Sequence, residues 1–102
     1  MEQSLCDVVA DIAQRFGSRS RIKLRGASVP EPWGNWLIAP SAGYLEADGC
    51  GPWAWREVEW VEVDPGDHGA APIAAAFKHA GLTAEVVECV VRVACWGGGG
   101  RT

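Results

Sequence analysis

The chain lacks the long apolar segments that membrane insertion requires. No run of hydrophobic residues approaches the roughly 20 that a bilayer-spanning helix needs. The start, MEQSLCDVVADIAQRF, carries neither the basic region nor the continuous apolar stretch of a secretory signal. These absences predict a cytoplasmic protein that has no membrane partner.

Cysteine pairs with metal-binding spacing are absent as well. The four cysteines include no Cys-x-x-Cys pair, the common unit of structural zinc sites. Cys89 and Cys95 fall in one predicted strand, where a rise of about 3.3 Å per residue would hold them about 20 Å apart. We therefore expect no disulfide, and we expect Cys89 and Cys95 to serve as small core residues.

Positive charge is scarce in the middle of the chain. Residues 26–65 hold seven acidic residues and a single basic one, Arg56, whereas residues 1–25 hold five basic and three acidic residues. Proteins that bind nucleic acids usually show the opposite bias, because basic patches release counterions from phosphates. The distribution therefore argues against direct nucleic-acid binding, and the basic run at 19–25 is interpreted as a half-exposed strand.

The residues that are present predict one small α+β domain. Of 102 residues, 48% are hydrophobic and 22% charged, which is typical of a folded chain. Apolar residues at intervals of three and four predict a helix from Ser4 to Phe16 and a second helix that starts near Pro72. Leu5, Val8, Val9, Ile12 and Phe16 form the expected buried stripe of the first helix.

Alternating and turn residues place the strands. Alternation predicts a strand at 21–25, an Asp-Gly turn at 48–49 marks a hairpin, and residues 85–96 form one last strand. The order α-β-β-β-α-β predicts an antiparallel sheet of about four strands with two helices packed on one face, over residues 1–96. The glycine-rich residues 97–102 are expected to be a flexible tail.

The segment 51–67, GPWAWREVEWVEVDPGD, combines three tryptophans with five acidic residues. Val58 and Trp60 alternate with glutamates, and then the phase shifts so that Val61 and Val63 become the apolar positions. A one-residue shift of this kind is typical of a β-bulge. We place the shift after Trp60, which predicts that Trp60 is buried between the sheet and a helix.

Two groups of residues resemble reactive sites, and both have simpler explanations. Glu57 and Glu59 could lie about 7 Å apart, as paired carboxylates do in some glycosidases, but alternate glutamates are ordinary on a solvated strand. Asp64, Asp67 and His68 resemble half of a metal site, although a turn rich in proline and glycine favours aspartate in any case. The sequence therefore predicts no catalytic residue, no metal and no cofactor.

The same segment resembles the central block of a family of small bacterial proteins of uncharacterised function. The family pattern is Gly-Pro, an aromatic residue, and then Val-Glu-Trp-Val-Glu-Val or its isoleucine variants. The matching residues here are Gly51, Pro52, Trp55, Val58, Glu59, Trp60, Val61, Glu62 and Val63. Because members of that family resemble toxin immunity proteins, the resemblance implies a small acidic antidote that binds a toxin.

Acidic residues beside tryptophans favour protein recognition. Clustered negative charge speeds encounter with a cationic surface, and exposed aromatic rings anchor the contact. The expected partner-binding residues are Trp53, Trp55, Glu57, Glu59, Glu62 and Asp64. They predict a non-catalytic inhibitor, monomeric or homodimeric, that occludes a basic surface of a protein partner, most simply a toxin immunity protein.

Two alternative functions remain open. One is a phage-encoded anti-defence inhibitor of the anti-CRISPR type, which would cover a basic nucleic-acid groove of its partner. The other is a small ligand-binding domain or enzyme, which a pocket lined by Trp33, Trp36 and His68 would favour.

Overall fold

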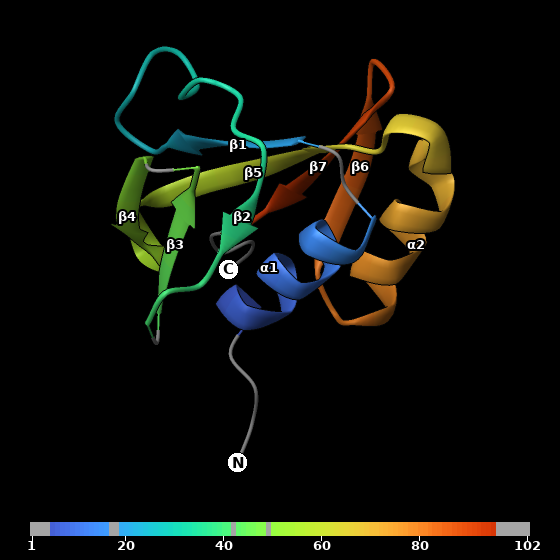
Figure 1. The fold of residues 1–102 in the computed structure, drawn as a ribbon, viewed down its shortest axis with the longest axis horizontal. Coiled ribbons are helices and arrows are strands. Elements are labelled where there is room, and N and C mark those ends of the chain that lie inside the picture. Colours follow the sequence, from blue (N-terminus) through green and yellow to red (C-terminus); the bar gives the residue numbers. More distant parts are fainter. Residues whose placement is uncertain (1–4, 17–18, 42, 49, 96–102) are drawn as a thin grey trace.

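The computed structural model describes residues 5–16, 19–41, 43–48 and 50–95. Within these residues the chain forms two α-helices, seven strands and two short 3-10 turns (Figure 1). In chain order the elements are α1 (Leu5–Phe16), β1 (Arg19–Leu24), β2 (Leu37–Ile38), β3 (Tyr44–Ala47), β4 (Cys50–Ala54), η1 (Trp55–Glu57), β5 (Val58–Asp64), η2 (Gly66–His68), α2 (Ala70–His79), β6 (Thr83–Val87) and β7 (Val90–Ala94). The α+β class is confirmed. The predicted tail at 97–102 lies outside the described residues.

The larger sheet has four antiparallel strands in the order β1-β5-β7-β6. Both helices cover one face of it, as predicted (Figure 1). On that inner face Val61, Val63, Val91 and Val93 are fully buried with Phe77 of α2. Alternate residues of the same strands point to the opposite face, which we call the outer face.

The smaller sheet is made by β2, β3 and β4 in that order. Ala47 pairs with Cys50 across the predicted two-residue turn, so the hairpin at 48–49 is confirmed. Asp48 has a positive φ of 47°, as such turns require, and Gly49 lies outside the described residues. Leu37 and Leu45 of this sheet belong to the same hydrophobic core as the buried residues of α1.

The bulge in β5 is confirmed, but it lies one step earlier than the sequence pattern suggested. Lys23 pairs with Trp60 and Leu24 pairs with Val58, so Glu59 is the extra residue. Val58 therefore points into the core, whereas Trp60 points to the outer face. Trp60 is buried, at 9% exposure, yet the prediction that it lies between sheet and helix is wrong.

The final segment is a hairpin rather than one strand. Val87 pairs with Val90, and the two residues between them, Glu88 and Cys89, have φ of 49° and 74°. This two-residue turn leaves Cys89 exposed, so the prediction that it is a core thiol is wrong, whereas Cys95 is buried. All four cysteines are free thiols in the structure.

The buried face of α1 is shifted from the predicted stripe. In α1 the small residues Cys6, Ala10 and Ala13 are buried with Val9 and Ile12, while Leu5 is 45% exposed. Small residues let the helix backbone approach the sheet closely, and the large residues at the margin of the stripe stay partly in solvent.

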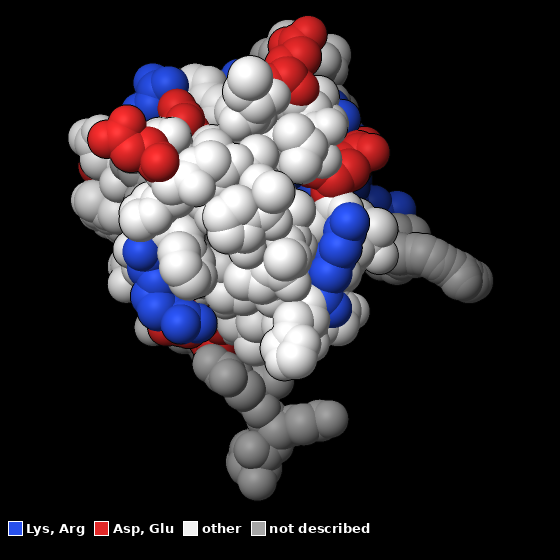
Figure 2. Space-filling model, turned by 90° about the vertical axis from the view of Figure 1, so that its right-hand side faces the viewer, with Lys and Arg blue, Asp and Glu red and all other residues white. Residues whose placement is uncertain are grey.

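The side of the molecule formed by α2 is largely uncharged at its centre, with acidic and basic residues nearer its margin (Figure 2). The helix sequence explains this, because Lys78 and His79 in its last turn are its only ionisable residues. No helix in the described part of the chain is both long and apolar enough to cross a membrane.

Candidate functional site

The predicted acidic surface is largely neutralised within the protein. Because β1 runs antiparallel beside β5, its basic residues lie opposite the acidic residues of β5. The ion pairs join Arg19 to Asp64 at 3.0 Å, Arg21 to Glu62 at 2.8 Å and Lys23 to Glu59 at 2.6 Å. The basic run at 19–25 and the acidic run at 58–64 therefore compensate each other on the outer face.

Glu62 does not lie on an accessible surface as its predicted role in partner binding requires, because only 1% of the residue is exposed. One carboxylate oxygen accepts a hydrogen bond from Arg21 Nε at 2.8 Å. The other accepts two from Arg92, from Nε at 3.0 Å and from Nη2 at 2.8 Å. Glu62 thus joins β1 and β7 through the central strand, which is a structural role.

Tryptophans complete this network. The guanidinium carbons of Arg19 and Arg21 lie 5.0 and 4.6 Å from the centroid of the Trp33 ring. Arg21 and Arg92 lie 5.9 and 4.4 Å from the Trp60 ring. Arginines and tryptophans therefore alternate across the outer face, and each close contact adds cation–π attraction. Trp60 is covered by arginines rather than by a helix.

Asp64 is the last residue of β5, and its carboxylate also contacts groups of the protein itself. Its carboxylate accepts a hydrogen bond from the Gly66 amide at 3.0 Å and pairs with Arg19. The backbone hydrogen bond, followed by the bond from Arg19, lowers the pKa of Asp64 below its usual value. An aspartate held in this way is a turn-forming residue, and only 27% of its side chain is exposed.

The other predicted residues lie where β4 passes through η1 into β5. Trp53 and Trp55 are half-buried, and Glu57 and Glu59 are exposed. We call residues 53–57 the 53–57 segment. It joins the smaller sheet to the larger one, and Arg56 lines two neighbouring hollows.

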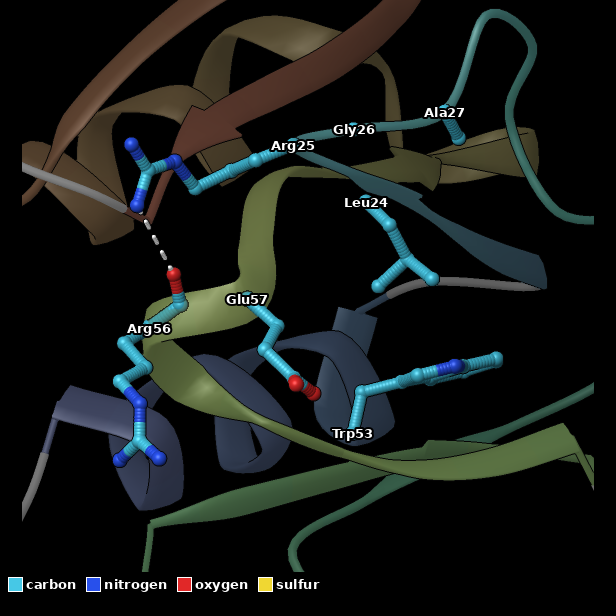
Figure 3. Close-up of a pocket in the computed structure, with 7 residues that line it drawn as sticks. All are labelled: Leu24, Arg25, Gly26, Ala27, Trp53, Arg56 and Glu57. Carbon is cyan, nitrogen blue, oxygen red and sulfur yellow. Dashed lines mark hydrogen bonds between the residues drawn. The ribbon is translucent and has the colours of Figure 1, made fainter.

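The larger hollow has a volume of about 740 Å³ and is lined by Leu24, Arg25, Gly26, Ala27, Trp53, Arg56 and Glu57 (Figure 3). We call it the Trp53 hollow. It forms because β1 ends beside η1, where the Arg25 amide donates a hydrogen bond to the Glu57 carbonyl at 2.9 Å. Its volume is in the usual range for ligand or side-chain binding.

The Trp53 ring lies close to the backbone of Gly51. Gly51 has a φ of +106°, and a Cβ built there would lie 2.9 Å from Trp53 Cε3. Only glycine therefore allows the ring to lie against this backbone. The half-buried ring also packs against the core, and a packed side chain loses less conformational entropy on binding than a freely rotating one.

The smaller hollow has a volume of about 290 Å³ and is lined by Gly43, Tyr44, Ala54, Trp55 and Arg56. Trp55 packs against the core on one side, and Tyr44 is 42% exposed. Tryptophan, tyrosine and arginine are the residue types most enriched at the energetic centres of protein interfaces. Two such hollows side by side make this the strongest candidate site.

Comparison with protein-family models, curated proteins and solved structures finds no match for this chain. The resemblance to immunity-type proteins therefore stays a prediction.

His68 and Trp33, named above for a metal site and for a ligand pocket, both contact other side chains of the protein. His68 packs edge-on against Phe16 at 6.0 Å, and Trp33 stacks on Arg19 and Arg21. Among the described residues no three His, Cys, Asp or Glu side chains are grouped to hold a metal ion.

Two cysteines are poor nucleophiles because of burial. Burial, and then the nearby Asp7, raises the pKa of Cys6 to about 11. Burial also raises the pKa of Cys95, and its proximity to Cys6 adds to this effect. A thiol that stays protonated at neutral pH is inert in nucleophilic chemistry.

Sequence reasoning missed most of the lining of the Trp53 hollow. Leu24, Arg25 and Ala27 are far from Trp53 in the chain, and their proximity depends on β1 pairing with β5. The available signal was the match between two alternating segments of opposite charge, 19–25 and 58–64. Opposite charges across neighbouring strands favour pairing of those strands.

Proposed function

We propose that this protein is a non-catalytic inhibitor that binds a protein partner through the 53–57 segment and its two hollows. The observation that carries the proposal is that Arg56 lines two depressions, one together with Trp53 and the other together with Trp55 and Tyr44. Partly exposed aromatic rings in preformed depressions supply apolar contact area with little loss of rotamer entropy.

The acidic area that would face a basic partner is smaller than the sequence suggested, and Arg25 and Arg56 line the same hollow as Glu57. Glu57 and Glu59 remain exposed, and Glu59 is paired with Lys23, whereas Glu62 is buried and Asp64 is held by Arg19. Glu57 forms no ion pair with any described residue, and its carboxylate is exposed to solvent. We propose that these carboxylates face a cationic surface of the partner, as an immunity protein faces the basic active site of a toxin.

Affinity capture from the organism that encodes the chain tests this proposal. The bait is the wild-type protein, a Glu57→Lys variant, or a Glu88→Lys variant that makes the same charge change in the β6–β7 turn. We expect one protein with a basic surface to be retained by wild type and Glu88→Lys and lost with Glu57→Lys. Equal retention by all three baits would contradict binding through the 53–57 segment.

An activity assay on the captured protein separates inhibition from mere binding. The wild-type chain should reduce the activity of the partner, and Glu57→Lys should leave that activity close to its uninhibited value. A partner that binds but keeps its full activity would contradict the inhibitor role.

A further inference from the structure

The Trp53 hollow places a carboxylate beside an indole ring. Leu24 and Trp53 face each other across the opening, and the Glu57 carboxylate reaches toward them from η1 (Figure 3). Glu57 Oε1 accepts a hydrogen bond from the Ala54 amide at 3.3 Å. Among the described residues the other carboxylate oxygen has no hydrogen-bond partner, so it is free to accept one from a bound group.

The arginines of the lining lie at the opposite end from the indole. Arg25 Nη1 is directed to the Arg56 carbonyl oxygen at 3.4 Å, and the Arg56 side chain extends away from Trp53 and Leu24 (Figure 3). Neither guanidinium group therefore occupies the space between Leu24, Trp53 and Glu57, and this space is open to a group from another molecule. That space has apolar walls and one acidic residue.

A cationic group with an apolar stem matches this arrangement. An arginine side chain buries its methylene groups against apolar surface and keeps its charge at the polar end. Its planar guanidinium stacks on indole rings and donates to carboxylates, and both partners are present here. An anionic group in the same position would approach the Glu57 carboxylate and be repelled.

We infer that the Trp53 hollow receives an arginine side chain of the partner protein. The methylene groups lie between Leu24 and Trp53, and the guanidinium contacts the Trp53 ring and the Glu57 carboxylate. The inference rests on the proposed function for the origin of that side chain, whereas the chemistry of the hollow rests on its own residues.

Titration of the purified protein with butylguanidinium tests the hollow without any partner. Binding is followed by NMR of the tryptophan indole N–H signals, and the Trp53 signal is assigned by its loss in Trp53→Phe. Butylurea is the uncharged probe of the same shape. The variants are Glu57→Gln, whose amide oxygen can still accept from Ala54, and Glu88→Gln as the matched loss of charge at a distance.

We expect butylguanidinium to shift the Trp53 signal most, with a dissociation constant in the millimolar range. Glu57→Gln and the change to butylurea should each weaken binding by about three- to fivefold, the effect of one exposed ion pair. Glu88→Gln should leave binding unchanged. Equal binding of both probes, unchanged binding in Glu57→Gln, or larger shifts at another indole would overturn the inference.

The outcomes separate the two proposals. If the probe binds as expected but capture of the partner is unaffected by Glu57→Lys, the proposed function fails while the hollow remains a guanidinium site. If capture depends on Glu57 but the probe does not bind at Trp53, the role assigned to the hollow fails alone.

Discussion

Glu62 offers the sharpest test of how the outer face is held together. The carboxylate is buried at 1% exposure and accepts hydrogen bonds from Arg21 and Arg92. In Glu62→Ala these two guanidinium groups lose their shared counter-charge and face each other across β5. Removing one member of a buried ionic group costs about 3–5 kcal/mol in general.

The lower end of that range applies here. The side chains of Arg21 and Arg92 are 29% and 33% exposed, so water can solvate part of their charge once the carboxylate is gone. We expect the free energy of unfolding to fall by about 3 kcal/mol, a large fraction of the roughly 5–15 kcal/mol typical of a small domain.

Urea denaturation followed by circular dichroism measures this change. With a slope of about 1–3 kcal/mol per molar urea, the midpoint of Glu62→Ala should fall by about 1–3 M. Asp11→Asn is the control, because the Asp11–Arg15 pair on α1 is largely exposed and should contribute at most about 0.5 kcal/mol.

A combined variant tests the reasoning from the other side. Arg21→Met, Glu62→Leu and Arg92→Met together remove every charge of the group, and apolar replacements of buried ion groups are often neutral or stabilising. The triple variant should therefore be more stable than Glu62→Ala. A loss below about 1 kcal/mol in Glu62→Ala, or a triple variant less stable than the single one, would refute the account of Glu62.

Three further predictions follow from local geometry. The turn residues Glu88 and Cys89 both have positive φ, so changing them to Asn and Gly should raise the free energy of unfolding by about 1–2 kcal/mol, measured by urea denaturation. The lowered pKa of Asp64 stabilises the fold above its unfolded pKa, and this contribution is lost as the pH falls through the folded pKa. The stability of Asp64→Asn measured against pH should therefore fall less steeply than that of wild type at acidic pH. In the native state at neutral pH Cys89 should react quickly with a thiol reagent, whereas Cys6 and Cys95 should react only on unfolding; fast reaction of all thiols would contradict their burial.

The fold class followed from local patterns that need no tertiary information. Alternation at 19–25 and 58–63, the Asp-Gly turn at 48–49 and the helical spacing of apolar residues each report one local structure. The phase shift near Trp60 also indicated a real bulge. Its position was ambiguous, because Val58, Trp60 and Val61 are all apolar and either face could have accepted the tryptophan.

Features that depend on unusual backbone or distant contacts were not predictable in this way. The turn at Glu88 and Cys89 has no glycine, asparagine or proline, so the sequence pattern predicted one strand where the structure has a hairpin. The pairing of each acidic residue of β5 with a basic residue of β1 depends on which strands are neighbours. The same neighbour relation creates the Trp53 hollow, which brings Leu24 close to Trp53.

The most direct test of the central claim is the association rate of the protein with its captured partner, measured by stopped flow at low and at physiological ionic strength. If the 53–57 segment is the binding surface, Glu57→Lys slows association strongly at low salt, Glu88→Lys changes it little, and the difference shrinks as salt screens the charges. If the two variants change the association rate equally, or if Glu57→Lys associates as fast as wild type at both ionic strengths, the partner binds elsewhere.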